Sequence, residues 1–306
     1  MPSGILLLDK PRGLSSNAAL QRVRRLLGGV KAGHAGSLDP LATGMLPICL
    51  GEATKIAGDI VSGEKRYRFS VTLGARTATG DAEGEVTGIA VVPALTRTAV
   101  EAVLAGLRGP QTQVPPMYSA LKQGGAPLYR LARRGVSVER APRTIELYEL
   151  KLLALEPRAL ELEARCSKGT YIRVLGEDIA TRLGTLGHVS ALRRLSVEPF
   201  EHEPMATLES LEEECARGAK PRLLPIDAPL KHLPAVALAA ASATRLLKGQ
   251  AVPCGPLQPA LAADGMTRVR LYGEAGQFLG IGIADGSGRV RPSRLLNVAG
   301  AAAPSG

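Results

Sequence analysis

The order of apolar and polar residues along the chain predicts a mixture of strands and helices. Strand patterns, either alternating or continuously apolar, occur at residues 4–9, 45–50, 67–73, 85–91, 144–155 and 160–167. Helical patterns, with apolar residues three or four positions apart, occur at residues 17–27, 96–107, 127–134 and 171–183. Gly33, Gly36 and Pro40 interrupt both patterns, and we expect residues 31–43 to be irregular.

A proline-rich connector separates two parts of the chain. Residues 221–234 contain four prolines, a composition that stiffens a connector and interrupts strand pairing. A short helix is expected after it, at residues 237–247. Three alternating stretches, typical of a small β-barrel-like module, follow at residues 267–272, 277–284 and 289–292. We therefore expect an α+β fold with two domains, residues 1–232 and residues 233–306.

Positive charge is concentrated in one segment. The whole chain has 38 Lys and Arg against 28 Asp and Glu, a formal charge of +10. Such an excess favours a polyanionic partner, because neutralised phosphates release condensed counterions. Residues 108–143 hold seven of the basic residues against one acid, a local charge of +6. We interpret this segment as a basic arm rather than part of the core, and nucleic acid is favoured over an acidic membrane.

Composition excludes several classes of protein. With 45% hydrophobic and 22% charged residues, most of the chain is not intrinsically disordered. The first ten residues lack a signal-peptide core, and the longest apolar stretch, residues 235–243, is too short to cross a bilayer. The four cysteines are too far apart for a compact zinc site, so we expect reduced, buried thiols in a cytoplasmic protein.

Asp39 is the first candidate for chemistry. It precedes Pro40, which disfavours the α conformation, so the carboxylate projects from an extended or turn backbone. Lys31, His34 and Ser37 place further polar groups in the same segment. Taken alone, an aspartate before proline is most often a turn former, and one carboxylate does not define a reaction.

Seven blocks of the sequence, in order, carry a resemblance to a known family. The longest block is KAGHAGSLDPLATGMLPICLG at residues 31–51. The other blocks are DKPRGLSS at 9–16, KRY at 65–67 running into LG at 73–74, TGDAEG at 79–84, QVPPMYSALK at 113–122, LY and AR within 128–133, and SKGTYIR at 167–173. Together they resemble the TruB family of bacterial tRNA pseudouridine-55 synthases, and the longest block closely resembles the catalytic motif of that family. The resemblance implies the pseudouridine synthase fold, with a large, mostly antiparallel mixed sheet and a small C-terminal PUA-like RNA-binding module.

The resemblance also implies a catalytic set. Asp39 would be the nucleophile that attacks the target nucleoside, so that uracil detaches, rotates and rejoins through C5. Arg173 would pair with Asp39, and a nearby guanidinium is expected to lower the pKa of the carboxyl. Tyr67 would lie against the target base, while Lys10 and Pro11 would support the loop without catalysing. The isomerisation has no net redox change and no group donor, so neither a cofactor nor a metal is expected. Attack at C1′ and attack at C6 both stay open.

Further positions match RNA-contacting residues of the family. Tyr171 and Leu192 would line the uracil pocket, and His34 would fill the place of the extruded nucleotide in the RNA. Lys122 and Arg133 lie in the basic arm, which would clasp the T-arm of tRNA through its phosphates. The resemblance favours a monomer without an obligate protein partner or a guide RNA.

Two other functions stay open from the sequence. A non-catalytic RNA-binding or RNA-folding protein would explain the basic arm. A glycosidic hydrolase would need a second carboxylate as acid or base, and Asp81 is only a distant candidate for that role.

Overall fold

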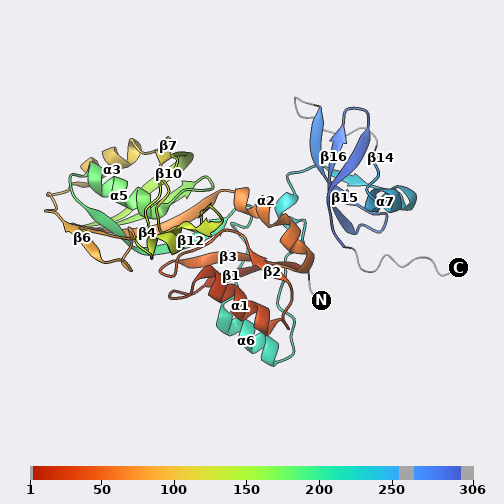
Figure 1. Ribbon diagram of the computed structural model, residues 1–306, viewed down its shortest axis with the longest axis horizontal. Helices are drawn as coiled ribbons and strands as arrows, with labels where there is room; N and C mark the ends of the chain where they lie inside the picture. Colours follow the sequence, from red (N-terminus) through yellow and green to blue (C-terminus); the bar gives the residue numbers. More distant parts are fainter. Residues whose placement is uncertain (1–2, 255–264, 298–306) are drawn as a thin grey trace.

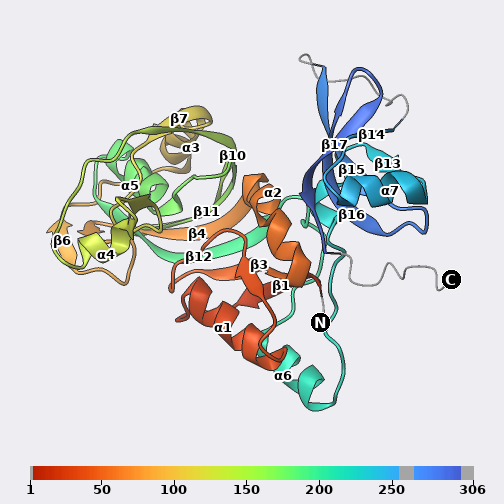
Figure 2. The ribbon, with the colours of Figure 1, turned by 45° about the vertical axis from the view of Figure 1, so that its right-hand side comes forward.

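The larger part of the fold is built on one eight-stranded sheet. The computed structural model describes residues 3–254 and 265–297 (Figures 1 and 2). In order of pairing, the main path of the sheet is β1 (Gly4–Lys10), β3 (Thr43–Leu50), β12 (Gly187–Val197), β4 (Lys65–Leu73), β11 (Ala159–Cys166), β10 (Arg143–Glu156) and β7 (Gly109–Gln113). A short strand, β2 (Ala32–His34), pairs with β3 off this path. Only the β3–β12 pair is parallel among these described strands, so the sheet is mixed and mostly antiparallel, as predicted.

Helices cover this sheet at separate places. The α-helices of the larger part are α1 (Ser16–Leu26), α2 (Ala57–Ser62), α3 (Arg97–Ala105), α4 (Leu128–Ala132), α5 (Ile172–Arg182) and α6 (Leu208–Ala216), and the 3-10 helices are η1 (Gly51–Ile56) and η2 (Ala228–Leu230). Helix α1 begins where Ser15 Oγ accepts a hydrogen bond from Ala18 N at 3.1 Å. Helices α1 and α6 lie side by side in both views, whereas α3 and α5 pack at the other end of the sheet (Figures 1 and 2). Two small hairpins, β5 (Ala75–Thr77) with β6 (Val86–Ile89) and β8 (Lys122–Gln123) with β9 (Ala126–Pro127), complete this part.

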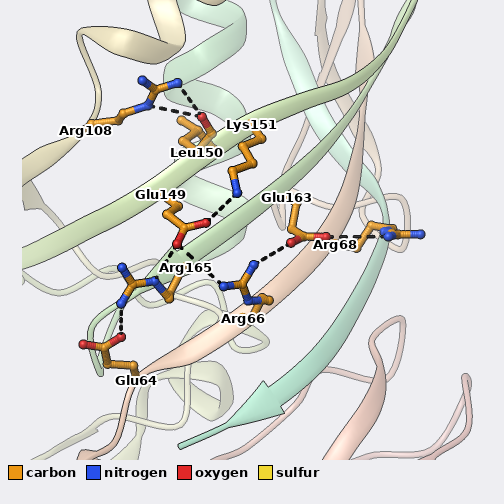
Figure 3. A network of polar contacts seen from close by, with 9 residues as sticks. All are labelled: Glu64, Arg66, Arg68, Arg108, Glu149, Leu150, Lys151, Glu163 and Arg165. Atoms are coloured by element: carbon orange, nitrogen blue, oxygen red, sulfur yellow. Dashed lines mark hydrogen bonds and ion pairs between the residues drawn. The ribbon is translucent and has the colours of Figure 1, made fainter. Parts of the chain in front are cut away.

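Strand β4 separates two environments. Its side chains are buried at every second position from Lys65 to Leu73, and this face joins the main core. Arg66 and Arg68 point to the opposite face, where acids of neighbouring strands pair with them (Figure 3). Glu163, for example, lies 2.8 Å from Arg66 and 3.6 Å from Arg68. The network comprises Glu64, Arg66, Arg68, Glu149, Lys151, Glu163 and Arg165. The charges on this face are therefore paired with one another.

The C-terminal part has its own sheet and core. Its elements are β13 (Ala235–Ala237), α7 (Ala240–Leu247), β14 (Val252–Pro253), β15 (Met266–Tyr272), β16 (Phe278–Asp285) and β17 (Arg289–Leu295). The sheet order is β13-β15-β16-β17-β14. Both views show this part beside α2, where Arg268 pairs with Asp59 at 2.7 Å and Ile281 packs into a core cluster of the larger part (Figures 1 and 2). The expected second domain, residues 233–306, extends outside the described residues at 255–264 and 298–306.

The strands and helices expected from the patterns are present with small shifts at their ends, but two other expectations were wrong. Residues 31–43 are not irregular throughout, because Ala32–His34 pair with β3 as β2. The basic segment, residues 108–143, does not lie wholly outside the main fold, because Gly109–Gln113 form β7 at the edge of the large sheet. An edge strand needs backbone pairing on one side only, and it therefore tolerates Pro110 and a polar sequence.

The expectation of four buried thiols was also wrong in part. Cys49 and Cys166 are buried, whereas Cys215 and Cys254 are partly exposed. Cys215 lies near the end of α6, a helix that buries only Leu208 and Leu211.

Candidate active site

The loop between β2 and β3 is held against the start of α1. Ser16 is buried, and its hydroxyl both accepts a hydrogen bond from Leu38 N at 2.7 Å and donates one to Leu38 O at 2.9 Å. Next to it, Ala42 N donates to Asp39 O at 3.0 Å, and Gly13 N donates to Pro40 O at 2.8 Å. The backbone on both sides of Asp39 is thus fixed by hydrogen bonds.

Asp39 and Arg173 meet as the sequence predicted. Arg173 lies in the first turn of α5 and is 4% exposed. Its Nε lies 2.9 Å from Asp39 Oδ2, while Nη1 donates to Thr79 O and Nη2 donates to Tyr118 O, both at 2.6 Å. The guanidinium is therefore held by two backbone carbonyls and directs its Nε–H to the carboxylate.

Asp81, which the sequence offered only as a remote candidate for a second carboxylate, lies in the same cluster. It is 3% exposed, and its Oδ2 lies 3.6 Å from Arg173 Nε. Thr79 Oγ1 donates to Asp81 Oδ1 at 2.6 Å, and Glu83 N donates to the same atom at 3.1 Å. The turn that carries Asp81 pairs with β12 and lies over the first turn of α5. Its place in one of the resembling blocks was the sequence signal for this position.

A cavity of about 370 Å³ opens beside this cluster. Five sequence-predicted residues line it, namely Asp39, Tyr67, Tyr171, Arg173 and Leu192. Tyr67 comes from β4 and Leu192 from β12, two paired strands whose buried side chains share one face. The volume lies within the range of roughly 300–1,000 Å³ that small-molecule sites occupy.

The other three predicted residues lie outside the cavity lining. His34 is on β2, and its buried Nδ1 has no hydrogen-bond partner in the described part of the chain. Lys122 on β8 and Arg133 at the end of α4 are exposed, and the Arg133 guanidinium lies 5.8 Å from the centre of the Tyr129 ring. These three residues are therefore not among those that line the cavity with Asp39.

The pKa of Asp39 is raised from its ordinary value, contrary to the expectation that Arg173 would lower it. Burial is the largest cause, and the negative charge of Asp81 adds to it, whereas Arg173 and Lys10 oppose the rise. The side chain of Asp39 is 40% exposed because it faces the cavity, so the carboxyl loses this solvation when the cavity fills. Burial also raises the pKa of Tyr67 and that of Tyr171.

Three buried cations lie beside the site. The sequence predicted only a supporting role for Lys10 and no role for Lys65 or Arg194. Lys10 is fully buried and donates to Pro11 O and Leu14 O, and burial lowers its pKa to about 8. Lys65 donates to Val61 O and Gly63 O at the end of α2, and burial lowers its pKa to about 8 as well. Arg194 is 1% exposed and lines the cavity. In a chain this rich in arginine, no motif or spacing distinguishes Arg194 from the other arginines.

The start of α5 receives its cap from another element. Tyr171 precedes α5, and its own side chain makes no capping hydrogen bond. Gln113 of β7 supplies one instead, because its Oε1 accepts from Tyr171 N at 3.0 Å and its Nε2 donates to Tyr171 O at 3.3 Å. This side chain therefore positions both Tyr171 and the turn that carries Arg173.

The described residues contain neither a candidate metal site nor a candidate membrane-spanning helix. Within residues 3–254 and 265–297, no group of three or more His, Cys, Asp or Glu side chains is arranged to hold a metal ion. No helix in the described ranges is long and apolar enough to span a membrane.

Comparison with known proteins identifies the family. Residues 24–172 match the N-terminal domain of TruB family pseudouridylate synthases. The chain is 51% identical to tRNA pseudouridine synthase B of Chromohalobacter salexigens, across 97% of this chain and 95% of that protein. This chain belongs to the TruB family. It is also 48% identical to tRNA pseudouridine synthase B of Aromatoleum aromaticum, across 99% of this chain and 95% of that protein. Residues 173–231 match the model of the tRNA pseudouridylate synthase B C-terminal domain. Residues 234–296 match the model of the C-terminal region of pseudouridine synthase II TruB.

Solved structures agree with the fold class. A chain in the crystal structure of a Cbf5–Nop10–Gar1 complex is 25% identical, with a TM-score of 0.69 across 92% of this chain and 78% of that chain. A second match, in an H/ACA ribonucleoprotein bound to a substrate RNA, is 21% identical with a TM-score of 0.69, across 96% of this chain and 84% of that chain. The predicted pseudouridine synthase fold, with its large mixed sheet and C-terminal β-rich module, is confirmed.

Proposed function

We propose that the chain is a tRNA pseudouridine synthase, an isomerase that converts a uridine in the T-loop of tRNA, position 55, to pseudouridine. The observation that carries this proposal is the contact between Asp39 and Arg173 at the edge of a cavity that Tyr67, Tyr171 and Leu192 also line. The relatives at 51% and 48% identity are named tRNA pseudouridine synthase B, which supports tRNA as the substrate. A non-catalytic RNA-binding protein would not need a carboxylate held in this way.

In the proposed reaction, the target uridine leaves its stack and enters the cavity. Asp39 attacks an electron-poor carbon, C1′ of the ribose or C6 of the base, and the C1′–N1 bond breaks. Uracil then rotates while Tyr67, Tyr171 and Leu192 retain it. A C1′–C5 bond forms, the bond between Asp39 and the attacked carbon breaks and restores the carboxylate, the C5 proton leaves and N1 gains a proton. The sum is an isomerisation, which needs neither an oxidant nor a group donor.

The basic segment is the proposed contact with the RNA backbone. Lys122, Arg130, Arg133 and Arg134 are exposed, and none of them forms an ion pair with another described residue. They differ in this from the arginines of β4 and β11, whose charges are paired within the sheet (Figure 3). Unpaired cations are available to phosphates, which position an RNA without reading its sequence.

His34 is proposed to occupy the space that the extruded nucleotide leaves. Burial lowers its pKa, and Arg194 lowers it further, so the imidazole is neutral at neutral pH. A neutral planar ring can stack on bases at a smaller desolvation cost than a charged one.

The proposed domains divide this work. Residues 1–232 would form the catalytic domain, with the RNA-contacting segment within residues 108–143, and residues 233–306 would form a PUA-like RNA-binding domain. All the residues proposed for the reaction belong to one chain, which supports a monomer without an obligate protein partner. We propose that this monomer acts on tRNA in the cytoplasm.

The deciding experiment measures tritium release from tRNA labelled at C5 of uracil, because a new bond at C5 must expel that hydrogen. The wild-type chain is expected to release tritium and to form no free uracil. The Asp39→Asn variant is expected to bind the tRNA but to release no tritium. Asp178→Asn is the matched control, since Asp178 lies on α5 away from the cavity lining. No release by the wild-type chain at concentrations that bind tRNA would reject the function, and free uracil would favour a hydrolase.

A further inference from the structure

Arg194 is one of four buried cations in the described part of the chain. It lies on β12, opposite Tyr67 of β4 on one side and Gly44 of β3 on the other. Its side chain is 1% exposed and is among the largest that are fully buried. Strand β4 carries Tyr67, and strand β3 follows directly after the loop that carries Asp39. Arg194 therefore lies between the segments that supply Tyr67 and Asp39.

The guanidinium connects this loop to the sheet. Its Nε donates to Met45 O of β3 at 2.7 Å, and its Nη2 donates to Gly36 O at 3.0 Å. Gly36 lies three positions before Asp39 and has a φ of 86°, and a Cβ there would lie 3.4 Å from Arg194 Nη1. The loop therefore lies in van der Waals contact with the guanidinium, and the positive φ at position 36 favours glycine.

No carboxylate neutralises this charge. Arg173 pairs with two aspartates, whereas none of the ion pairs among residues 3–254 and 265–297 includes Arg194. Two carbonyl oxygens offset only part of the desolvation cost of a buried cation. An apolar side chain of similar size would avoid this cost, so packing alone does not account for an arginine here.

The charge acts on the groups around the cavity. It opposes the rise that burial causes in the pKa of Tyr67, and it contributes to the lowered pKa of His34. The other titratable groups that affect Tyr67 are Cys166 of β11 and Asp39 of the loop, and both act in the opposite direction from Arg194. Lys10 and Lys65, with pKa values of about 8, lose their charge at mildly alkaline pH, whereas a guanidinium keeps its charge.

We propose that Arg194 is a positioning residue of the isomerisation. It fixes the loop of Asp39 through the Gly36 carbonyl, and it keeps a permanent positive charge beside Tyr67 on the cavity wall. This inference rests on the proposed function, because it assigns Arg194 a part in that same reaction.

The experiment compares Arg194→Met, which removes the charge, with Arg194→Lys, which keeps a cation but loses the planar pair of donors. The matched control is Arg193→Met, because Arg193 is the next residue on β12 and pairs with Asp9 at 2.7 Å at a half-exposed site. For each full-length variant, the single-turnover rate of pseudouridine formation and the tRNA Kd are measured at pH 7 and pH 9. Urea unfolding establishes that each variant is folded.

Arg194→Met is expected to slow the single turnover by roughly 10²-fold with little change in Kd, as is typical when a preorganised charged donor is removed. Arg194→Lys is expected to lose about tenfold at pH 7 and more at pH 9, because a lysine buried there loses its proton as Lys10 and Lys65 do. Arg193→Met is expected to match the wild type.

Three results would overturn the proposal. One is an Arg194→Met rate equal to that of the wild type. Another is an Arg194→Lys rate that stays a constant fraction of the wild-type rate between the two pH values. Unfolding of both Arg194 variants would assign the residue to stability alone. Failure of the proposed function is distinct, because the wild-type chain itself would then form no pseudouridine.

Discussion

Arg173 Nε lies 2.9 Å from Asp39 Oδ2, and the same nitrogen lies 3.6 Å from Asp81 Oδ2. One guanidinium therefore serves two carboxylates, one facing the cavity and one buried behind it. Backbone carbonyls of Thr79 and Tyr118 occupy its other two nitrogens. This arrangement leaves Arg173 little freedom to turn away from Asp39.

Arg173→Lys is expected to slow pseudouridine formation by at least about 10²-fold, because an ammonium cannot reproduce the planar set of four contacts. The measurement is the single-turnover rate with saturating enzyme. Arg182→Lys is the control, since Arg182 lies at the end of the same helix and is exposed. Equal rates for the two variants would contradict the importance of the four contacts.

As the proposed nucleophile, Asp39 must be ionised to attack, and its pKa is raised. The acid limb of the pH–rate profile is therefore expected to have its midpoint above the ordinary aspartate value of 3.8. Asp81→Asn removes a nearby negative charge, which lowers the pKa of Asp39 and moves the limb to lower pH. Lys10→Met removes a positive charge, which raises that pKa and moves the limb to higher pH. Single-turnover rates between roughly pH 4 and 8 report both shifts, and shifts in the same direction would refute this electrostatic account.

Gln113→Ala is expected to lower the free energy of unfolding by about 1 kcal/mol, as the loss of a helix cap does. Because Arg173 lies in the turn that Gln113 caps, the reaction rate should fall as well. Urea unfolding and single-turnover rates measure the two effects. Gln111→Ala, on the same strand, should change neither, and an unchanged rate in Gln113→Ala would show that Arg173 does not depend on this cap.

Ile281→Ala is expected to lower the free energy of unfolding by about 2–4 kcal/mol, because it leaves a cavity in the core cluster between β16 and the larger part. Arg268→Ala breaks the ion pair with Asp59 and should cost less than about 1 kcal/mol, since that arginine is 48% exposed. Urea unfolding compares them. A larger loss for Arg268→Ala would mean that charge rather than apolar packing joins the two parts.

The sequence predicted the elements that follow a regular period and the residues that lie in the resembling blocks. The β4 strand alternates strictly, and Ser15 caps α1 just before the helical pattern at residues 17–27. Asp39, Tyr67, Tyr171 and Arg173 lie in those blocks, Leu192 matched a family position outside them, and all five line one cavity. Their chemical roles stay predictions until the variants are measured.

Elements without a clear period were missed. Strand β12 places Arg193 and Arg194 in succession, one partly exposed and one buried, so it shows no simple alternation of apolar and polar residues. Helix α6 buries only Leu208 and Leu211 and is otherwise acidic, which is a weak helical signal. The placement of Asp81 and the pKa of Asp39 depend on contacts between distant segments, which no local pattern reports.

The parallel contact between β3 and β12 is a narrow joint. It consists of the pairs Arg193 with Thr43 and Arg194 with Gly44, and a Cβ at Gly44 would collide with the Arg194 carbonyl. Asp39 belongs to the strand group on one side of this joint, and Tyr67, Leu192 and Arg173 belong to the other. Neither group contains a complete reaction centre, so the enzyme acquires its chemistry only when the two half-sheets dock. A single larger side chain at position 44 is therefore expected to abolish catalysis without altering any of the residues proposed to contact the uridine.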